Sequence, residues 1–79
     1  MIKVLFFGPV AERIGSSVLG IEHRPGLRLH DLRNELSKQY PQAFDIVSFM
    51  AVNGAHARDL DQELADHSEV AFMANFSGG

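Results

Sequence analysis

Cysteine is absent from this sequence of 79 residues. Its absence excludes disulfide bridges, thiolate metal sites and a cysteine nucleophile. The length fits one domain, residues 1–79, with no room for a second. A domain of this size buries roughly 60% of the surface that its unfolded chain exposes, so we expect its stability to be modest.

Positive charge and long apolar runs are also scarce. The seven Lys and Arg residues are scattered and the formal net charge is −3, which argues against the basic surface of a nucleic-acid-binding protein. The apolar start, Met1–Phe7, is interrupted by Lys3 and is far too short for a signal peptide or a membrane span. We therefore expect a cytoplasmic protein with neither a nucleic-acid nor a membrane partner.

Patterns typical of metal, nucleotide or nucleophile sites are missing as well. The four histidines are too dispersed for a zinc pattern and fit a solvated surface better. The acidic run from Asp59 to Glu63 lacks the glycine and terminal glutamate of a calcium loop, so helix capping or solubility explains it better. Ser16, Ser17 and Ser77 have no base partner in the sequence, and no phosphate-binding loop of the usual spacing occurs. We expect no bound metal and no bound cofactor.

The first residues predict a strand. Branched and aromatic residues from Met1 to Phe7 end at Gly8-Pro9, which breaks a strand. The period of two places Ile2, Val4 and Phe6 on one face. Lys3 marks the other face as the open one, so Leu5 and Phe7 should form an apolar patch there.

The rest of the chain predicts one main helix and further strands. Leu29, Leu32, Leu36 and Tyr40 form one helical stripe, which Pro41 ends. Asn53-Gly54 is a strong signal for a tight turn. The other expected elements are a weaker strand over 17–23 in a hairpin with the first, a strand over 49–53, a return strand over 55–58, a helical turn or loop over 59–64 and a final strand over 70–76. One helix against a mixed sheet of four to five strands makes an α+β domain.

The last three residues, Ser77–Gly79, extend beyond the final strand as a flexible tail. Gly78 and Gly79 supply a carboxylate with no nearby side chain, and glycine allows any φ in a narrow channel. Such a tail reaches ~10 Å beyond the fold, at ~3.3–3.6 Å per residue. A terminal glycine pair arises by chance at about 0.5%, given ~7% glycine in average proteins. These are the properties of a group that enters the active site of another protein.

Several stretches resemble one family, the small subunits of molybdopterin synthase, which are the MoaD branch of the ubiquitin-like sulfur carriers in the MoaD/ThiS superfamily. The similar stretches, in order, are Met1–Phe7, Pro25-Gly26 with 31–33, 51–53, 69–72 and Ser77–Gly79. They span essentially the whole chain. No single motif decides the resemblance, which rests on their order and spacing.

The resemblance implies a ubiquitin-like β-grasp fold and a sulfur carrier in molybdenum cofactor biosynthesis, with no enzyme activity by itself. An E1-like enzyme would bind ATP and adenylate the carboxylate of Gly79. A sulfur donor would then convert it to a thiocarboxylate, a sulfur nucleophile. The synthase large subunit would receive the tail in a heterotetramer, while the carrier alone would be a monomer. Adenylate and thiocarboxylate would be transient covalent states.

The resemblance also implies which residues meet the partners. Gly79 carries the sulfur and Gly78 belongs to the tail. An apolar patch near the tail suits a docking surface, so we expect partner contacts at Leu5, Phe7, Met73, Phe76 and Ser77.

Three positions depart from the family pattern. Members commonly carry two prolines shortly before the tail, where this chain has Ala74-Asn75, and a smaller aliphatic residue where it has Phe76. Prolines would stiffen the exit of the tail and keep its backbone from pairing. His67-Ser68 stands where a glycine is usual.

Two alternatives stay open. One is a sulfur carrier for another pathway, such as thiamine, cysteine or a thio-metabolite, although thiamine carriers of this kind usually lack the Phe-Phe first strand. The other is a ubiquitin-like module that is conjugated to lysines or binds a partner through its sheet.

Overall fold

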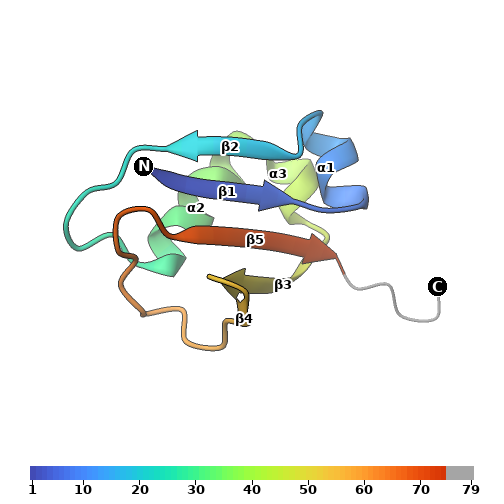
Figure 1. Ribbon diagram of the computed structural model, residues 1–79. Helices are drawn as coiled ribbons and strands as arrows, with labels where there is room; N and C mark the ends of the chain where they lie inside the picture. Colours follow the sequence, from blue (N-terminus) through green and yellow to red (C-terminus); the bar gives the residue numbers. More distant parts are fainter. Residues whose placement is uncertain (75–79) are drawn as a thin grey trace.

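A mixed sheet of five strands forms one layer, and the helices pack against one of its faces (Figure 1). The computed structural model describes residues 1–74. Its elements in chain order are β1 (Ile2–Phe6), α1 (Pro9–Ile14), β2 (Val18–Ile21), α2 (Leu29–Gln39), α3 (Pro41–Phe44), β3 (Val47–Val52), β4 (Ala55–His56) and β5 (Glu69–Ala74).

The sheet order is β2-β1-β5-β3-β4. β1 pairs with β2 antiparallel and with β5 parallel, while β3 pairs antiparallel with both β5 and β4. The first and last strands are therefore neighbours in the middle of the sheet, and α2 crosses behind them (Figure 1). This arrangement is the ubiquitin-like β-grasp fold, and it confirms the predicted α+β class.

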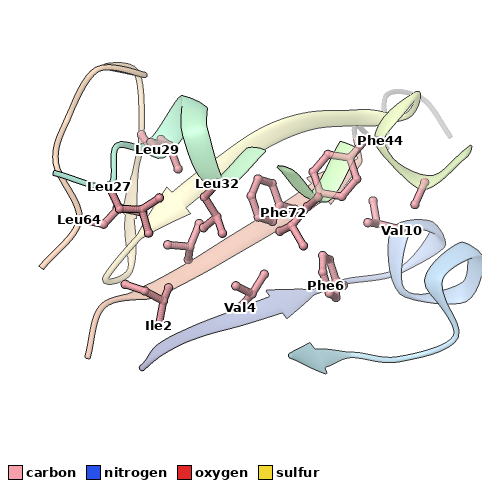
Figure 2. Packing of buried hydrophobic residues seen from close by; sticks show 14 of the residues in the cluster. Ile2, Val4, Phe6, Val10, Leu27, Leu29, Leu32, Phe44, Leu64 and Phe72 are labelled. Carbon is pink, nitrogen blue, oxygen red and sulfur yellow. The ribbon is translucent and has the colours of Figure 1, made fainter. Parts of the chain in front are cut away.

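The core lies between the sheet and α2, as the alternation in β1 predicts. Ile2, Val4 and Phe6 are fully or nearly fully buried, and so is the predicted stripe of Leu29, Leu32 and Leu36 on α2. Figure 2 shows Ile2, Val4 and Phe6 of β1 meeting Leu29 and Leu32 of α2 between the two layers. Burial of each large aliphatic or aromatic side chain contributes about 1.5–3 kcal/mol, so this contact is the main source of stability.

Three aromatic rings fill the end of the core where β1 and β5 terminate. Phe72 lies 6.1 Å from Phe6 and 5.0 Å from Phe44, measured between ring centroids, and Phe6 and Phe44 are 6.4 Å apart. Each ring comes from a different element: β1, α3 and β5. The cluster therefore ties α3 to the two central strands.

Two short helices were not predicted. β1 and β2 do pair antiparallel, but α1 lies between them instead of a simple hairpin turn. Pro9 opens α1 because its fixed φ suits the first helical position, and only Val10 of this helix is buried. Pro41 ends α2 as predicted and also opens α3, which buries Ala43 and Phe44. Helices of six and four residues are too short to show a helical period.

The strand boundaries shift by one to a few residues from those predicted. β3 begins at Val47 and ends at Val52, and β4 covers only Ala55–His56 of the expected 55–58. Asn53 and Gly54 form the predicted tight turn, with φ of 52° and 83°, as a two-residue type I′ turn requires. Residues 59–64 form a loop rather than a helical turn. β5 begins at Glu69, and its predicted extension to residue 76 lies outside the described residues.

The loop before β5 is fastened to the start of α2. The amides of Leu29 and His30 donate to the carbonyls of Gln62 and Leu60, at 3.0 and 2.9 Å. These are two of the amides that a helix N-terminus leaves without an internal partner. The Asp31 carboxylate accepts the Arg28 amide at 3.0 Å. Loop carbonyls and one acidic side chain therefore cap the helix.

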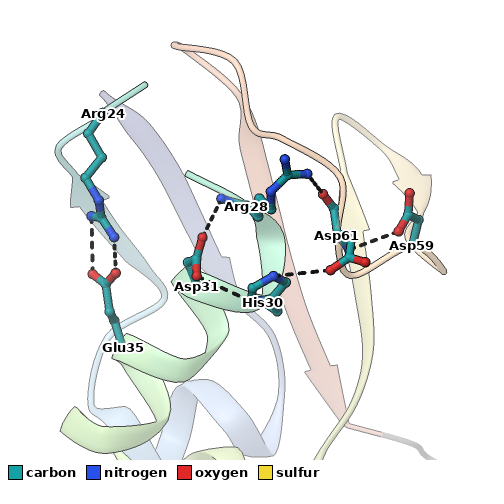
Figure 3. Close-up of polar contacts among 7 residues, drawn as sticks. All are labelled: Arg24, Arg28, His30, Asp31, Glu35, Asp59 and Asp61. Carbon is teal, nitrogen blue, oxygen red and sulfur yellow. Dashed lines mark hydrogen bonds and ion pairs between the residues drawn. The ribbon is translucent and has the colours of Figure 1, made fainter. Parts of the chain in front are cut away.

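Ion pairs on the surface surround this cap (Figure 3). The His30 ring lies 3.4 Å from Asp31 and 3.2 Å from Asp61. Arg24 pairs with Glu35 on α2, and that hydrogen bond raises the pKa of the guanidinium. The pairs are exposed, so each contributes little to stability. The Asp59 carboxylate accepts the Asp61 amide within the loop at 2.9 Å and the Asp61 carboxylate contacts His30, so the α2 amides are capped by loop carbonyls and not by these two side chains.

Candidate functional site

The face of the sheet opposite α2 is covered by none of the described helices (Figure 1). On this face, residues that pair across neighbouring strands form rows that run perpendicular to the strands. One row runs through the pairs Val18–Leu5, Leu5–Ala71, Ala71–Ala51 and Ala51–His56. These residues alternate with the buried ones on each strand, so they share the uncovered face.

A second row lies closer to the end of β5. Met73 pairs with Phe49 of β3. Phe7 follows β1, and its amide donates to the Phe72 carbonyl at 3.3 Å, which continues the β1–β5 register to place Phe7 beside Met73. Phe7 is 46% exposed and Phe49 38% exposed. We call the apolar residues of these two rows the open-face patch: Leu5, Phe7, Val18, Phe49, Ala51, Ala71 and Met73.

The open face is polar at its other end. Lys3 lies opposite Gly20 on β2 and Glu69 on β5. Both charged side chains are exposed. Polarity therefore falls along the face from the start of β5 toward its end. Contiguous apolar surface rimmed by polar residues is typical of a protein-binding site, and here it lies at the end of the sheet from which residues 75–79 continue.

The predicted site residues fall into two groups. Leu5, Phe7 and Met73 lie together on the open face, half-buried or exposed, where the alternation placed them. Phe76, Ser77, Gly78 and Gly79 lie outside the described residues. The docking role of the first group and the carrier role of Gly79 remain predictions.

Val18 and Phe49 belong to the patch but were missed in the sequence. Each lies on a strand that the sequence pattern indicates only weakly. The face on which its side chain lies depends on the register of that strand with its neighbour. For Phe49 a signal was available. The Asn53-Gly54 turn fixes the phase of β3, and counting back by twos from Asn53 through Ala51 reaches Phe49.

Ala74 stands where the family commonly has proline, and the sheet continues through it. Ala74 is buried and pairs with Val47 on β3, after a register shift between Val47 and Phe49 that leaves Ser48 as an extra residue. Proline lacks the amide hydrogen that strand pairing uses. β5, which contributes Ala71 and Met73 to the open-face patch, therefore stays paired in the sheet as far as residue 74.

His67 and Ser68, which stand at the usual glycine position, form a strained turn before β5. His67 has φ of 68°, a left-handed conformation that glycine adopts without cost. Its amide donates to the Met1 carbonyl at 3.0 Å, and the carbonyl of the buried Ser68 accepts the Lys3 amide at 2.9 Å. The N-terminal ammonium hydrogen-bonds Asp66 and lowers the pKa of that carboxyl. These bonds hold the turn in a conformation that histidine disfavours.

Other kinds of site find little support in residues 1–74. No group of three or more His, Asp or Glu side chains in this part of the chain is arranged to hold a metal ion. No helix in the same range is long and apolar enough to cross a membrane. A hollow of about 260 Å³ lies between α1, the end of α2 and α3, lined by Arg13, Gln39, Tyr40, Pro41, Gln42 and Ala43. The Arg13 guanidinium there already donates to the Gln42 carbonyl at 2.9 Å.

Comparison with known proteins agrees with the fold and with the resemblance in the sequence. Residues 4–79 match the ThiS family. The chain belongs to this family. The molybdopterin synthase sulfur carrier subunit of Caenorhabditis elegans is 31% identical over 81 residues, which cover 99% of this chain and 96% of that protein. The predicted relationship to molybdopterin synthase small subunits is thereby confirmed.

Solved structures match this ThiS-family chain over nearly its full length. A chain in the complex of subunits 1 and 2 of the molybdopterin-converting factor of Helicobacter pylori aligns with a TM-score of 0.67 and 23% identity, covering 99% of this chain and 97% of that one. SAMP1 of Haloferax volcanii aligns with a TM-score of 0.82 and 21% identity, covering 99% and 98%. At these identities the two matches show the shared fold.

Proposed function

We propose that this chain is the sulfur carrier subunit of a molybdopterin synthase and that Gly79 carries the sulfur. The observation that carries the proposal is the similarity to the nematode sulfur carrier subunit along almost the whole of both chains. The proposal takes the carboxyl group of Gly79 as the carried group, and neither Gly78 nor Gly79 has a side chain that would obstruct a narrow active site. The cytoplasm is the compartment that we propose for it.

The proposed cycle changes only the terminal carboxyl group. An oxygen of the Gly79 carboxylate attacks the α-phosphate of ATP on an E1-like enzyme, and pyrophosphate leaves. Sulfide from a sulfur donor then attacks the acyl carbon of the adenylate and AMP leaves, which yields a thiocarboxylate. In the synthase large subunit this sulfur displaces an oxygen leaving group from a carbon of the pterin precursor, and water cleaves the resulting thioester, which leaves the sulfur on the pterin and restores the Gly79 carboxylate. Two such transfers supply the two sulfurs of the dithiolene.

This chain contributes the carried group and the docking surface. It has no cysteine, so the sulfur has to come from a separate donor. The sequence has no phosphate-binding loop of the usual spacing, so the proposal assigns ATP to the E1-like enzyme. The open-face patch lies at the tail end of the sheet, where both receiving proteins would meet the carrier. The carrier alone is proposed to be a monomer, joining the large subunit in a heterotetramer.

The intact mass of the protein tests the carrier role directly. We expect protein purified from its own host without alkylating reagents to include a species heavier by one oxygen-to-sulfur exchange, located at Gly79 by fragmentation. A variant that lacks Gly79 is the matched control and should show no such species. If only the plain carboxylate forms, even with the E1-like enzyme, ATP and a sulfur donor, the carrier role is wrong.

A second candidate function is that of a ubiquitin-like modifier, favoured by the fold shared with the archaeal modifier SAMP1. In that case Gly79 would form isopeptide bonds with lysines of other proteins. Peptide mapping distinguishes the two, because a modifier leaves Gly-Gly remnants on target lysines. A carrier for another pathway would show the thiocarboxylate but would not support molybdopterin synthesis with the large subunit.

A further inference from the structure

Phe49 on the open face is held by a neighbouring ring. The Asn53-Gly54 turn pairs Ala51 with His56, which places His56 diagonally across from Phe49 on the same face. The two ring centroids are 5.8 Å apart and the planes meet at 67°, an edge-to-face contact. β4 is only two residues long, and one of these residues is His56. The tight turn and the short return strand thus bring an aromatic partner to Phe49.

The other flank of Phe49 faces the end of β5. Met73 is its direct partner across the strands. Phe49 nevertheless keeps 38% of its surface exposed. An exposed aromatic side chain with neighbours on two sides loses less rotamer freedom on binding than a free one. Aromatic side chains of this kind are enriched among the residues that dominate binding energy.

We propose that Phe49 is an aromatic anchor for the subunit that receives Gly79, and that His56 is the residue that positions its ring. The inference rests on the proposed function. From residue 74 to Gly79 the chain reaches ~17 Å at most, at ~3.3–3.6 Å per residue. A protein that holds Gly79 in its active site therefore has to lie against this end of the sheet, where Phe49 and Met73 are neighbours.

The occupant that we propose is the synthase large subunit. A chain of this fold occurs in the complex of subunits 1 and 2 of the molybdopterin-converting factor of Helicobacter pylori, so the second subunit of the synthase is a partner that the fold is seen to bind. Phe49 lies on β3, at the β4 side of the open-face patch, so the subunit that takes its ring has to reach this side of the sheet. The matching surface on the large subunit should be an apolar pocket for the Phe49 ring.

Binding of the purified large subunit to carrier variants tests the inference. We expect Phe49→Ala to raise Kd at least tenfold, as truncation of an aromatic anchor does. His56→Ala should raise Kd about three- to tenfold, and His56→Phe should restore it to within about twofold because an edge-to-face partner is retained. Leu60→Ala removes an equally exposed apolar side chain from the loop before β5, away from the patch, and should leave Kd unchanged.

Three results would overturn the proposal. The first is an unchanged Kd for Phe49→Ala, in protein whose thermal unfolding shows that it is folded. The second is equal weakening by His56→Ala and His56→Phe, since a positioning role requires rescue by the second ring. The third is a Phe49→Ala variant that binds the large subunit normally but is loaded slowly by the E1-like enzyme, since the occupant would then be the loading enzyme. Failure of the carrier function itself is recognised separately, because wild-type Gly79 would then never gain sulfur.

Discussion

His67 shows how a single backbone angle can cost stability. Its φ of 68° is a conformation in which a side chain crowds the backbone, at a cost of about 1 kcal/mol. We expect His67→Gly to raise the free energy of unfolding by about 0.5–1 kcal/mol. Urea denaturation at neutral pH measures the change, and a domain of this size should gain roughly 3–6 °C in Tm.

Asn53 provides the matched control for this substitution. It also has positive φ, 52°, but its side-chain oxygen accepts the Glu69 amide at 2.9 Å. Asn53→Gly would relieve a conformation that asparagine already tolerates and would remove that hydrogen bond, so we expect a loss of stability. If both glycine variants changed stability in the same direction, relief of backbone strain at His67 would not be the explanation.

Strands and helices whose apolar residues repeat the strand or helix period several times could be predicted from the sequence. The two shortest helices could not. β1 and α2 each repeat their period several times, so their buried faces could be assigned residue by residue. α1 buries Val10 alone, and α3 consists of only four residues, the first of which is Pro41. In the sequence Pro41 predicts the end of α2, yet the fixed φ of proline equally suits the first position of the next helix. Only packing against the sheet decides between the two.

At the start of α2, stability depends on one acidic side chain more than on a visible ion pair. Asp31 accepts the Arg28 amide and carries negative charge at the positive end of the helix dipole. We expect Asp31→Ala to lower the free energy of unfolding by about 1 kcal/mol. Glu35→Ala removes the exposed pair with Arg24 instead and should cost less than about 0.5 kcal/mol. Urea denaturation of the two variants compares them, and equal losses would contradict the capping role.

For the whole molecule, the two faces of the sheet should respond differently to truncation of a side chain. Phe72 is fully buried in the aromatic cluster, so Phe72→Ala should cost about 3–5 kcal/mol. That is a large part of the ~5–15 kcal/mol by which small domains are stable. Val18→Ala on the open face should cost less than about 1 kcal/mol, since Val18 is 46% exposed. Thermal unfolding followed by circular dichroism measures both, and similar losses would mean that the open face is part of the core.

The candidate site could be predicted only in part, because it is assembled from strands that are distant in the sequence. Leu5, Phe7 and Met73 follow from alternation within well-marked strands. Phe49 joins them only through the pairing of β3 with β5, and Val18 only through that of β2 with β1. The Asn53-Gly54 turn indicates which face Phe49 takes, but nothing local to either residue records which strand lies beside it. The predicted role of the tail came from the family resemblance, because the periodicity of the sequence indicates strands and helices and gives no information about chemistry.

The central position of β5 has a consequence for how the protein is made. The ribosome releases this strand late. β1 and β3 do not pair with each other, and only β5, which lies between them, joins the two halves of the sheet. A chain cut short before residue 69 lacks the middle of its sheet and two of the three ring contacts of its aromatic cluster. Such a fragment exposes its core and is a substrate for proteases. Folding itself therefore selects complete chains, so the molecules that survive in the cell are those synthesised through to the segment that leads into the tail.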